Sequence, residues 1–287
     1  RLTDSEYCLA MSLRAIPPIF PKSTVTEIDG RLDDICRAHG VRIPLAIESG
    51  SRAWGFPSPD SDFDCRFVFV RPVDQHLSPW SHRDVIETPL VDELDVNGWD
   101  LSKALKLLLK GNAVIIEWLR SPIVYRGEPW FRDGLLEFAN RRANRDLVAK
   151  HYLHLGERQR RVYFADGTSV PQKKIFYALR PAATLRWLRL HSDASVAPMH
   201  FPTLMAECEP PEDVALLVAD LIERKSLTRE LGSEALPPAI SAFVDYEFSL
   251  ARSCFEGRSA PASEEAREEA NELYREFVLR TFAASVS

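Results

Sequence analysis

The sequence predicts an α+β fold in which a small mixed β-sheet with its helices is followed by a second, all-helical part. Two observations predict this fold. Up to about residue 128, short apolar runs bounded by turn residues alternate with amphipathic stretches, whereas from about residue 130 nearly every segment has helical periodicity. We therefore expect one domain over residues 1–128 and a second over residues 129–287.

The first part is expected to contain both strands and helices. The strands are predicted from apolar runs between turn residues, at 43–48, 63–72, 84–90, 92–99 and 121–127. The helices are predicted from apolar residues at helical spacing, over 23–40, 101–110 and 113–120. Gly40 is a C-terminal stop signal, and Asp100 and Asn112 are natural N-caps.

The second part has helical periodicity almost throughout. The helical segments are residues 131–161, 173–191, 211–232, 239–256 and 263–285. Pro181 falls inside the second of these segments and should kink or split the helix. Residues 190–202 read as a loop that could border a cleft.

Composition restricts the functional class. The formal net charge of -6 provides no global basic field, so nucleic acid would have to meet a local patch, and we expect no sequence-specific DNA binding. The five cysteines lack CxxC or CxxxC spacing, which argues against a zinc site and a disulfide framework. No apolar run approaches the length of a membrane span and the start has no signal-peptide profile, so we expect a cytoplasmic protein without a membrane partner.

Residues 47–70, IESGSRAWGFPSPDSDFDCRFVFV, carry the strongest functional signal. Side chains alternate along a strand, so Asp62 and Asp64 point to one face, where two carboxylates repel unless a divalent cation lies between them. Ahead of them, Gly50 and Ser51 form a small-residue turn whose N–H groups and hydroxyl suit a phosphate. Together they predict a metal that bridges a nucleoside triphosphate to the protein, as in nucleotidyl transfer with two metal ions.

Such a site usually needs a third carboxylate on a neighbouring strand. Asp95 lies in the extended part of residues 92–100 and is the preferred candidate, whereas Asp100 has a ready role as a helix cap. The two could exchange roles, because Asn97 and Gly98 interrupt the apolar strand pattern. Glu48, at the end of the first predicted strand, is interpreted as a structural residue that orients the turn.

The motif matches a known pattern, which runs Gly-Ser, a further Gly and then Ser-Asp-x-Asp. The matching residues are Gly50, Ser51, Gly55, Ser61, Asp62 and Asp64. The stretch resembles the signature of the DNA polymerase β-like nucleotidyltransferases. With residues 95–125 and 173–188 it is similar to a bacterial subgroup that includes RNA-repair-pathway, ligase-associated nucleotidyltransferases, and this similarity covers roughly residues 25–190.

The resemblance implies a small mixed-sheet catalytic domain that moves a nucleotide from a nucleoside triphosphate to a hydroxyl acceptor and releases pyrophosphate. It implies Mg²⁺ or Mn²⁺ as the cofactor, bound by Asp62, Asp64 and Asp95, with Asp95 as the general base. The residues expected to bind the nucleotide are Gly50, Ser51, Arg52, Ser61, Lys173, Lys174, Tyr177 and Arg180. Three of these, Lys173, Tyr177 and Arg180, share one helical face, and for Arg52 a surface ion pair is an equally good interpretation.

The acceptor is left open by the sequence. Resemblance to the repair-associated members suggests an RNA end, for which the arginines at 141, 142, 145, 158, 160 and 161 offer a local basic track. A protein or a small hydroxylated molecule is the alternative acceptor. A non-catalytic nucleotide-binding regulator with the same fold is a further alternative, although retention of repelling carboxylates speaks against it.

Overall fold

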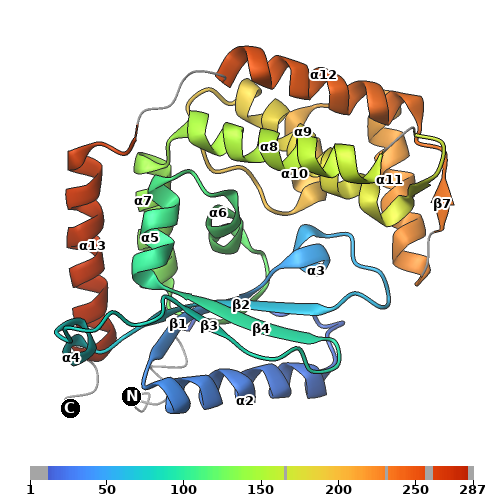
Figure 1. Cartoon of the computed structure of the whole chain (residues 1–287). Coiled ribbons are helices and arrows are strands. Elements are labelled where there is room, and N and C mark those ends of the chain that lie inside the picture. Colours follow the sequence, from blue (N-terminus) through green and yellow to red (C-terminus); the bar gives the residue numbers. More distant parts are fainter. Residues whose placement is uncertain (1–11, 165–166, 230–231, 256–260, 284–287) are drawn as a thin grey trace, which may run out of the picture.

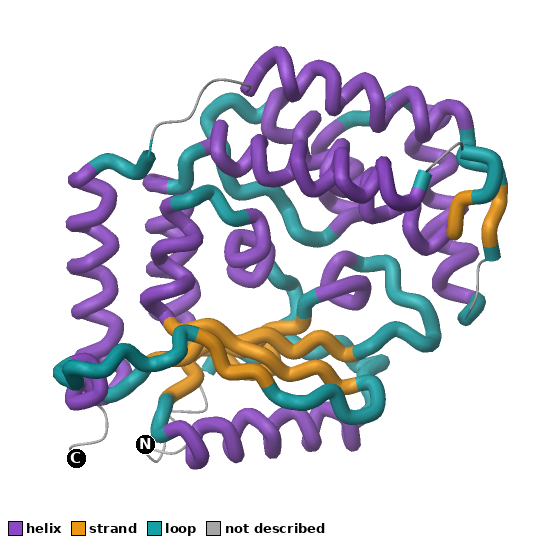
Figure 2. The backbone as a smooth tube through the Cα atoms, viewed as in Figure 1, coloured by secondary structure: helices purple, strands orange, loops and turns teal. Residues whose placement is uncertain are grey.

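The computed structural model describes residues 12–164, 167–229, 232–255 and 261–283. It confirms the α+β fold, because a mixed sheet in the first half is followed by a helical region (Figure 1 and Figure 2). Within the described residues, none of the helices has the length and apolar character that crossing a membrane requires.

The main sheet has the strand order β3-β4-β2-β1-β5. Its strands are β1 (Arg42–Glu48), β2 (Phe63–Val70), β3 (Val85–Glu87), β4 (Leu94–Asp100) and β5 (Val124–Gly127). β2 and β4 run parallel, whereas the other neighbours pair antiparallel. Parallel pairing brings the first residues of β2 and β4 to the same edge of the sheet.

Helices cover both faces of this sheet (Figure 1). α2 (Lys22–His39) packs on one face through Ile28 and Leu32, and Gly40 ends the helix in the left-handed region, at φ 61°. α5 (Leu101–Leu109) and α6 (Ala113–Arg120) cover the other face. Their N-caps are confirmed, because the Asp100 side chain accepts a hydrogen bond from the N–H of Ser102 and the Asn112 side chain accepts those at 114 and 115.

The second half contains longer helices and one small β-ribbon. The helices are α7 (Pro129–Arg142), α8 (Arg145–Tyr163), α9 (Gln172–Leu190), α10 (Phe201–Cys208), α11 (Glu212–Leu227), α12 (Pro238–Phe255) and α13 (Glu264–Ala283), and the ribbon pairs β6 (Val170–Pro171) with β7 (Ser233–Glu234). α8 packs along α9, which also contacts α10 and α12. α7 and α13 instead pack on α5, beside the sheet (Figure 1). The expected boundary at residue 128 precedes α7.

Local structure differs from expectation at several points. Residues 50–54 form the short helix α3 (Gly50–Trp54) rather than a turn, and α4 (Val73–His76) and α10 are not predicted by periodicity. The segment 131–161 divides into α7 and α8, since Asn144 caps α8 by accepting two backbone N–H groups. Pro181 does not split α9, which runs unbroken because tertiary packing buries the helix around the proline.

Candidate active site

Two of the predicted acids lie side by side in the sheet. Asp64 in β2 is directly opposite Asp95 in β4 in the parallel register, and 29% of each side chain is exposed. Asp62 lies just before β2 and is exposed. Asp95, rather than Asp100, is therefore the acid that shares this end of the sheet with the pair in the motif.

Arg66 joins the two strand acids. Its Nη2 donates hydrogen bonds to Asp64 Oδ1 at 3.1 Å and to Asp95 Oδ2 at 2.6 Å. Burial raises the pKa of Asp64, the Arg66 guanidinium opposes this, and the carboxylates of Asp95 and Asp62 raise it further. Arg66 belongs to none of the predicted motifs, although its position two residues after Asp64 in a strand places it on the same face.

Gly50 lets the backbone approach Asp64 closely. Gly50 has a φ of 63°, and a Cβ at this position would lie 2.2 Å from Asp64 Oδ2. The first residue of α3 must therefore be a glycine for two reasons, the left-handed backbone and the contact with the carboxylate. The contact with Asp64 explains why a small residue is needed at this position, although the structure has the start of a helix where a turn was expected.

Hydrogen bonds hold the motif loop on α3. The Ser51 hydroxyl donates to Ser61 Oγ at 2.8 Å, and Ser61 Oγ also accepts the N–H of Ser58 at 2.9 Å. Arg52 donates to the carbonyl oxygens of Ser61 and Asp62, and its guanidinium lies 3.8 Å from the centroid of the Phe63 ring. Arg52 thus fixes the loop that carries Asp62, and among the described residues it makes no ion pair with an acid.

Glu48 lies beneath the surface of the site and is hydrogen-bonded to the backbone of Asp64. The residue is fully buried, and its carboxylate accepts the Asp64 backbone N–H at 2.9 Å and the hydroxyl of Tyr125. Burial raises the pKa of Glu48 to about 8, against the two donors, which lower it. This placement agrees with the structural role inferred from the sequence.

A cavity of about 290 Å³ opens in front of the motif. One wall carries Gly50, Ser51, Asp62 and Asp64 from the sheet half. The facing wall carries Lys173, Lys174 and Tyr177 from α9 and Lys225 from α11. Acids and a glycine therefore face cations across a space close to the lower end of the range of small-molecule sites, which is about 300–1,000 Å³.

Comparison with known proteins identifies the family. Residues 25–276 match the RNA repair pathway DNA polymerase beta family, RlaP. The chain belongs to this family. It is also 38% identical over 221 residues to "Uncharacterized protein YcgL" of Bacillus subtilis (strain 168), an alignment that covers 77% of this chain and 84% of that protein. As a member of the RNA repair pathway DNA polymerase beta family, the chain is a polymerase β-like, nucleotidyltransferase-like protein, and the suspected subgroup is confirmed.

Arg180 lies outside the cavity lining of this family member. Its side chain is buried, donates from Nη2 to Glu117 Oε1 at 2.8 Å and lies 3.9 Å from the Trp54 ring centroid. Trp54 itself donates to the same glutamate at 3.2 Å. Arg180 therefore stabilises α3 through Glu117 and Trp54. Because it does not line the cavity, its position does not match the nucleotide contact predicted for it.

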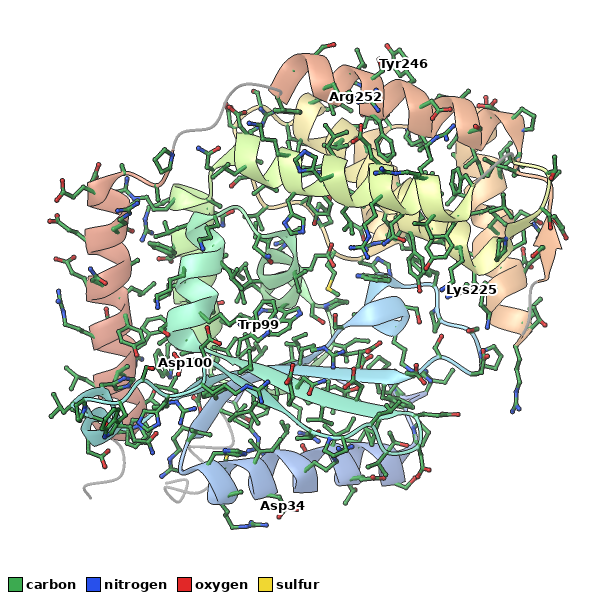
Figure 3. The ribbon with its side chains drawn as sticks, in the orientation of Figure 1. Asp34, Trp99, Asp100, Lys225, Tyr246 and Arg252 are labelled. Carbon is green, nitrogen blue, oxygen red and sulfur yellow. The ribbon has the colours of Figure 1, made fainter. Side chains whose placement is uncertain are left out.

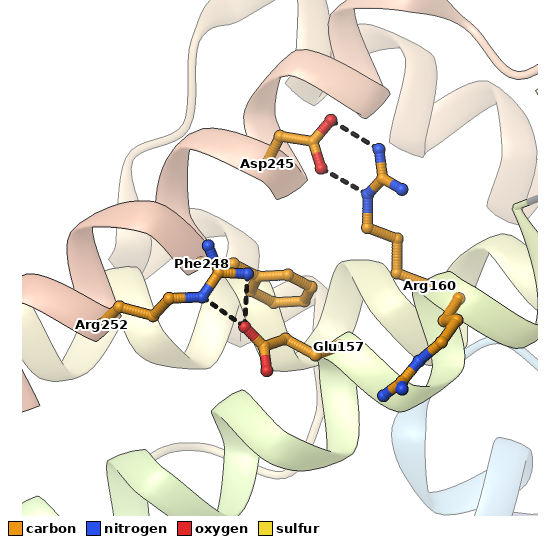
Figure 4. Close-up of a pocket in the computed structure, with 6 residues that line it drawn as sticks. Glu157, Arg160, Asp245, Phe248 and Arg252 are labelled. Carbon is orange, nitrogen blue, oxygen red and sulfur yellow. Dashed lines mark hydrogen bonds and ion pairs between the residues drawn. The ribbon is translucent and has the colours of Figure 1, made fainter. Parts of the chain in front are cut away.

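The arginines of the expected basic track are mostly engaged within the protein. Arg141 and Arg142 pair with Glu269, and Arg145 donates to the Leu188 carbonyl oxygen. Figure 4 shows that Arg160 pairs with Asp245, in a pocket where Arg252 also pairs with Glu157. Ion pairs thus engage three of the six arginines and a backbone carbonyl oxygen engages a fourth, so the six do not form one open basic surface for RNA.

The acids fit a divalent cation in their chemistry, although they are not arranged as a finished metal site. Within the described residues, no group of three or more histidine, cysteine or acidic side chains is positioned to hold a metal ion. Asp64 and Asp95 nevertheless supply adjacent carboxylate oxygens, the ligands that Mg²⁺ prefers, and Arg66 supplies the positive charge between them. A cation would have to take over the charge compensation that Arg66 provides.

Proposed function

We propose that this protein transfers a nucleoside monophosphate from a nucleoside triphosphate to a hydroxyl at an RNA end, with release of pyrophosphate, in the cytoplasm. One observation carries the proposal: Asp62, Asp64 and Gly50 line one cavity together with three lysines, and Asp95 lies directly beside Asp64 in the sheet. The family supports a polymerase β-like activity and an RNA repair setting. The cytoplasmic location is favoured by the cysteine pattern of the sequence.

The residues would divide the reaction between the two walls. Asp62, Asp64 and Asp95 would hold Mg²⁺ or Mn²⁺, which supplies positive charge for the reacting phosphate. Lys173 and Lys174 would bind the triphosphate from the opposite wall. Asp95 would accept the proton of the attacking hydroxyl as general base.

The proposed order of events requires Arg66 to change partners. In the structure its guanidinium holds Asp64 and Asp95 together, so the two carboxylates are already positioned before any cation arrives. Preorganised acids reduce the reorganisation that accompanies binding. Arg66 would then move toward the phosphates or remain with the main-chain oxygen of Asp95, to which its Nη1 donates at 2.9 Å.

The test is nucleotide transfer with purified protein. Each α-labelled nucleoside triphosphate is incubated with Mg²⁺ and, in turn, with cellular RNA, with cell protein or without a macromolecule. The double variant Asp62→Asn, Asp64→Asn should transfer no label, whereas Asp34→Asn, an exposed acid on α2, should behave as wild type. Asp34 is labelled in Figure 3, on the far side of the sheet from the helical half.

Each outcome has a defined meaning. Label in RNA that depends on the two acids supports the proposal, and label in protein redirects it to a protein acceptor. Absence of label in every acceptor, with Mg²⁺ and nucleotide binding retained, would leave the non-catalytic regulator or a small-molecule acceptor. The double variant should keep its fold, because removing like charges relieves repulsion and Arg66 retains its ion pair with Asp95.

A further inference from the structure

Lys225 is a buried cation that the proposed site does not yet explain. It lies in α11, about fifty residues beyond the other cavity lysines, and only 4% of the residue is exposed. Its ammonium donates a hydrogen bond to the carbonyl oxygen of Phe56 and lies 4.7 Å from the centroid of that ring. A buried ammonium group normally has a carboxylate partner, because desolvation of a charge is costly.

The acid that faces Lys225 is already engaged. Asp60 forms an ion pair with Lys173 at 3.1 Å, and both residues line the cavity. No ion pair of Lys225 with a carboxylate is present in the part of the chain that the structure describes. Burial and the nearby charge of Lys173 lower the pKa of Lys225, Asp60 opposes them, and the net result is a pKa of about 8. The protein thus holds a cation close to its titration point in a cavity.

The charges around Lys225 favour an anionic ligand on its side of the cavity. Lys173 and Lys174 line the same wall, whereas Asp62 and Asp64 lie on the opposite wall with Gly50. Lys174 lies 4.7 Å from the Tyr177 ring centroid and Lys173 is paired with Asp60, so each has a partner in the protein. Lys225 contacts the carbonyl oxygen and the ring of Phe56, and it is the most deeply buried of the three lysines, so its charge is held away from water without a carboxylate partner among the described residues.

We propose that Lys225 binds the polyphosphate of the nucleotide and donates a proton to the pyrophosphate as it leaves. The proposal deepens the proposed function and rests on it. Figure 3 places Lys225 between the helical half and the sheet half, at the opposite side of the molecule from Asp100. A lysine delivered by α11 would give the last third of the chain a direct part in the reaction, beyond packing.

The acceptor oxygen attacks the α-phosphorus, and its proton passes to the carboxylate of Asp95. The bond between the α-phosphorus and the bridging oxygen breaks, and the electron pair leaves on that oxygen. The ammonium of Lys225 gives one proton to this oxygen and becomes a neutral amine, which takes a proton back from water after pyrophosphate departs.

Two substitutions separate charge from proton donation. Lys225→Arg keeps a cation that does not release its proton, and Lys225→Met removes the cation while keeping a flexible apolar chain. Lys106, an exposed lysine on α5, provides the matched controls Lys106→Arg and Lys106→Met. Thermal melts of all four variants establish that the fold is intact before any functional comparison.

The first measurement is the dissociation constant for inorganic pyrophosphate with Mg²⁺, by calorimetry. We expect Lys225→Met to weaken binding at least about 10-fold and Lys225→Arg to change it by less than about 3-fold. Neither control should change it. Equal binding by Lys225→Met and wild type would overturn the contact between Lys225 and the polyphosphate.

The second measurement is kcat and kcat/KM for label transfer as functions of pH. Wild-type kcat/KM, which reports the free enzyme, should fall as the pH rises through about 8, because the amine form has no proton to donate. Lys225→Arg should lower kcat about 100-fold with little change in KM, and should lose the decline near pH 8. An unchanged kcat with an unchanged decline would overturn the proton transfer. Absence of transfer by wild type would refute the proposed function and the proton step together, and the pyrophosphate titration would still decide the contact.

Discussion

Replacement of Glu48 by glutamine should stabilise the protein at alkaline pH and leave its stability almost unchanged in mild acid. Glu48 is fully buried beneath Asp64, and burial raises its pKa from 4.5 to about 8. In the unfolded chain the carboxyl titrates near its ordinary pKa. Between these two values the folded protein therefore retains a proton that the unfolded chain has released.

The sign and size of the effect follow from this difference. When the folded state binds more protons, the free energy of unfolding decreases as the pH rises, so wild type loses stability from about pH 4.5 up to about pH 8. One pKa unit corresponds to about 1.4 kcal/mol, so the free energy of unfolding should have fallen by an amount on the order of 5 kcal/mol when the pH reaches about 8. Glutamine has no proton to lose, and its amide oxygen can still accept the Asp64 N–H.

The assay is urea unfolding of wild type and Glu48→Gln at several values between about pH 5 and about pH 9. The difference in unfolding free energy should widen steadily in favour of the variant. Glu137→Gln, in which 72% of the original side chain is exposed, is the matched control and should show no such trend. A difference that stays constant with pH, or a variant that is less stable at the alkaline end, would refute this account of Glu48.

Two further substitutions test the geometry around Asp64. Gly50→Ala should reduce label transfer at least about 100-fold, because its Cβ would displace the Asp64 carboxylate. Gly40→Ala is the control, since Gly40 has nearly the same φ, 61°, but a Cβ there would meet nothing closer than 3.7 Å. This control should only lower the free energy of unfolding, by about 1–2 kcal/mol. Equal activity of the two variants would refute the role of this contact. Arg66→Met should lower the melting temperature in the absence of Mg²⁺, because the ion pairs with Asp64 and Asp95, which contribute about 1–3 kcal/mol to stability, are lost and the two acids repel. Mg²⁺ should therefore stabilise this variant more than it stabilises wild type. Thermal melts with EDTA and with Mg²⁺ check this, and a variant indifferent to Mg²⁺ would contradict the view that Arg66 and the cation compensate the same charge.

The sequence predicted those features that depend on neighbours in the chain. Apolar runs located β1, β2 and β4, and the side chains of Asp100 and Asn112 predicted the starts of α5 and α6. Motif spacing brought Asp62 and Asp64 together, and a preference for strand over cap selected Asp95. Each of these inferences uses information within a few residues.

The features that escaped prediction depend on tertiary contacts. Lys225 has no motif around it, and only the packing of α11 against the loop at Phe56 brings its ammonium to the cavity. Arg180 shares a helical face with Lys173, yet the Arg180 guanidinium is bound by Glu117 from α6. Helical periodicity cannot reveal such partners, because a face that is cationic in one turn of α9 is buried in the next.

The position of α13 has a consequence for the order in which the protein is made. Phe277 of α13 packs against Trp130 and Phe131, and a Cβ on Gly134 would lie 2.6 Å from its ring, so α7 is shaped to receive this last helix. Tyr274 also reaches back to His76 at 3.1 Å. During synthesis the sheet and its acids leave the ribosome well before residue 264 does. Because the chain grows at about 5–20 residues per second, α5 and α7 are without their contacts to α13 for several seconds or longer. A nascent chain therefore exposes the apolar face of α7 until α13 has been synthesised.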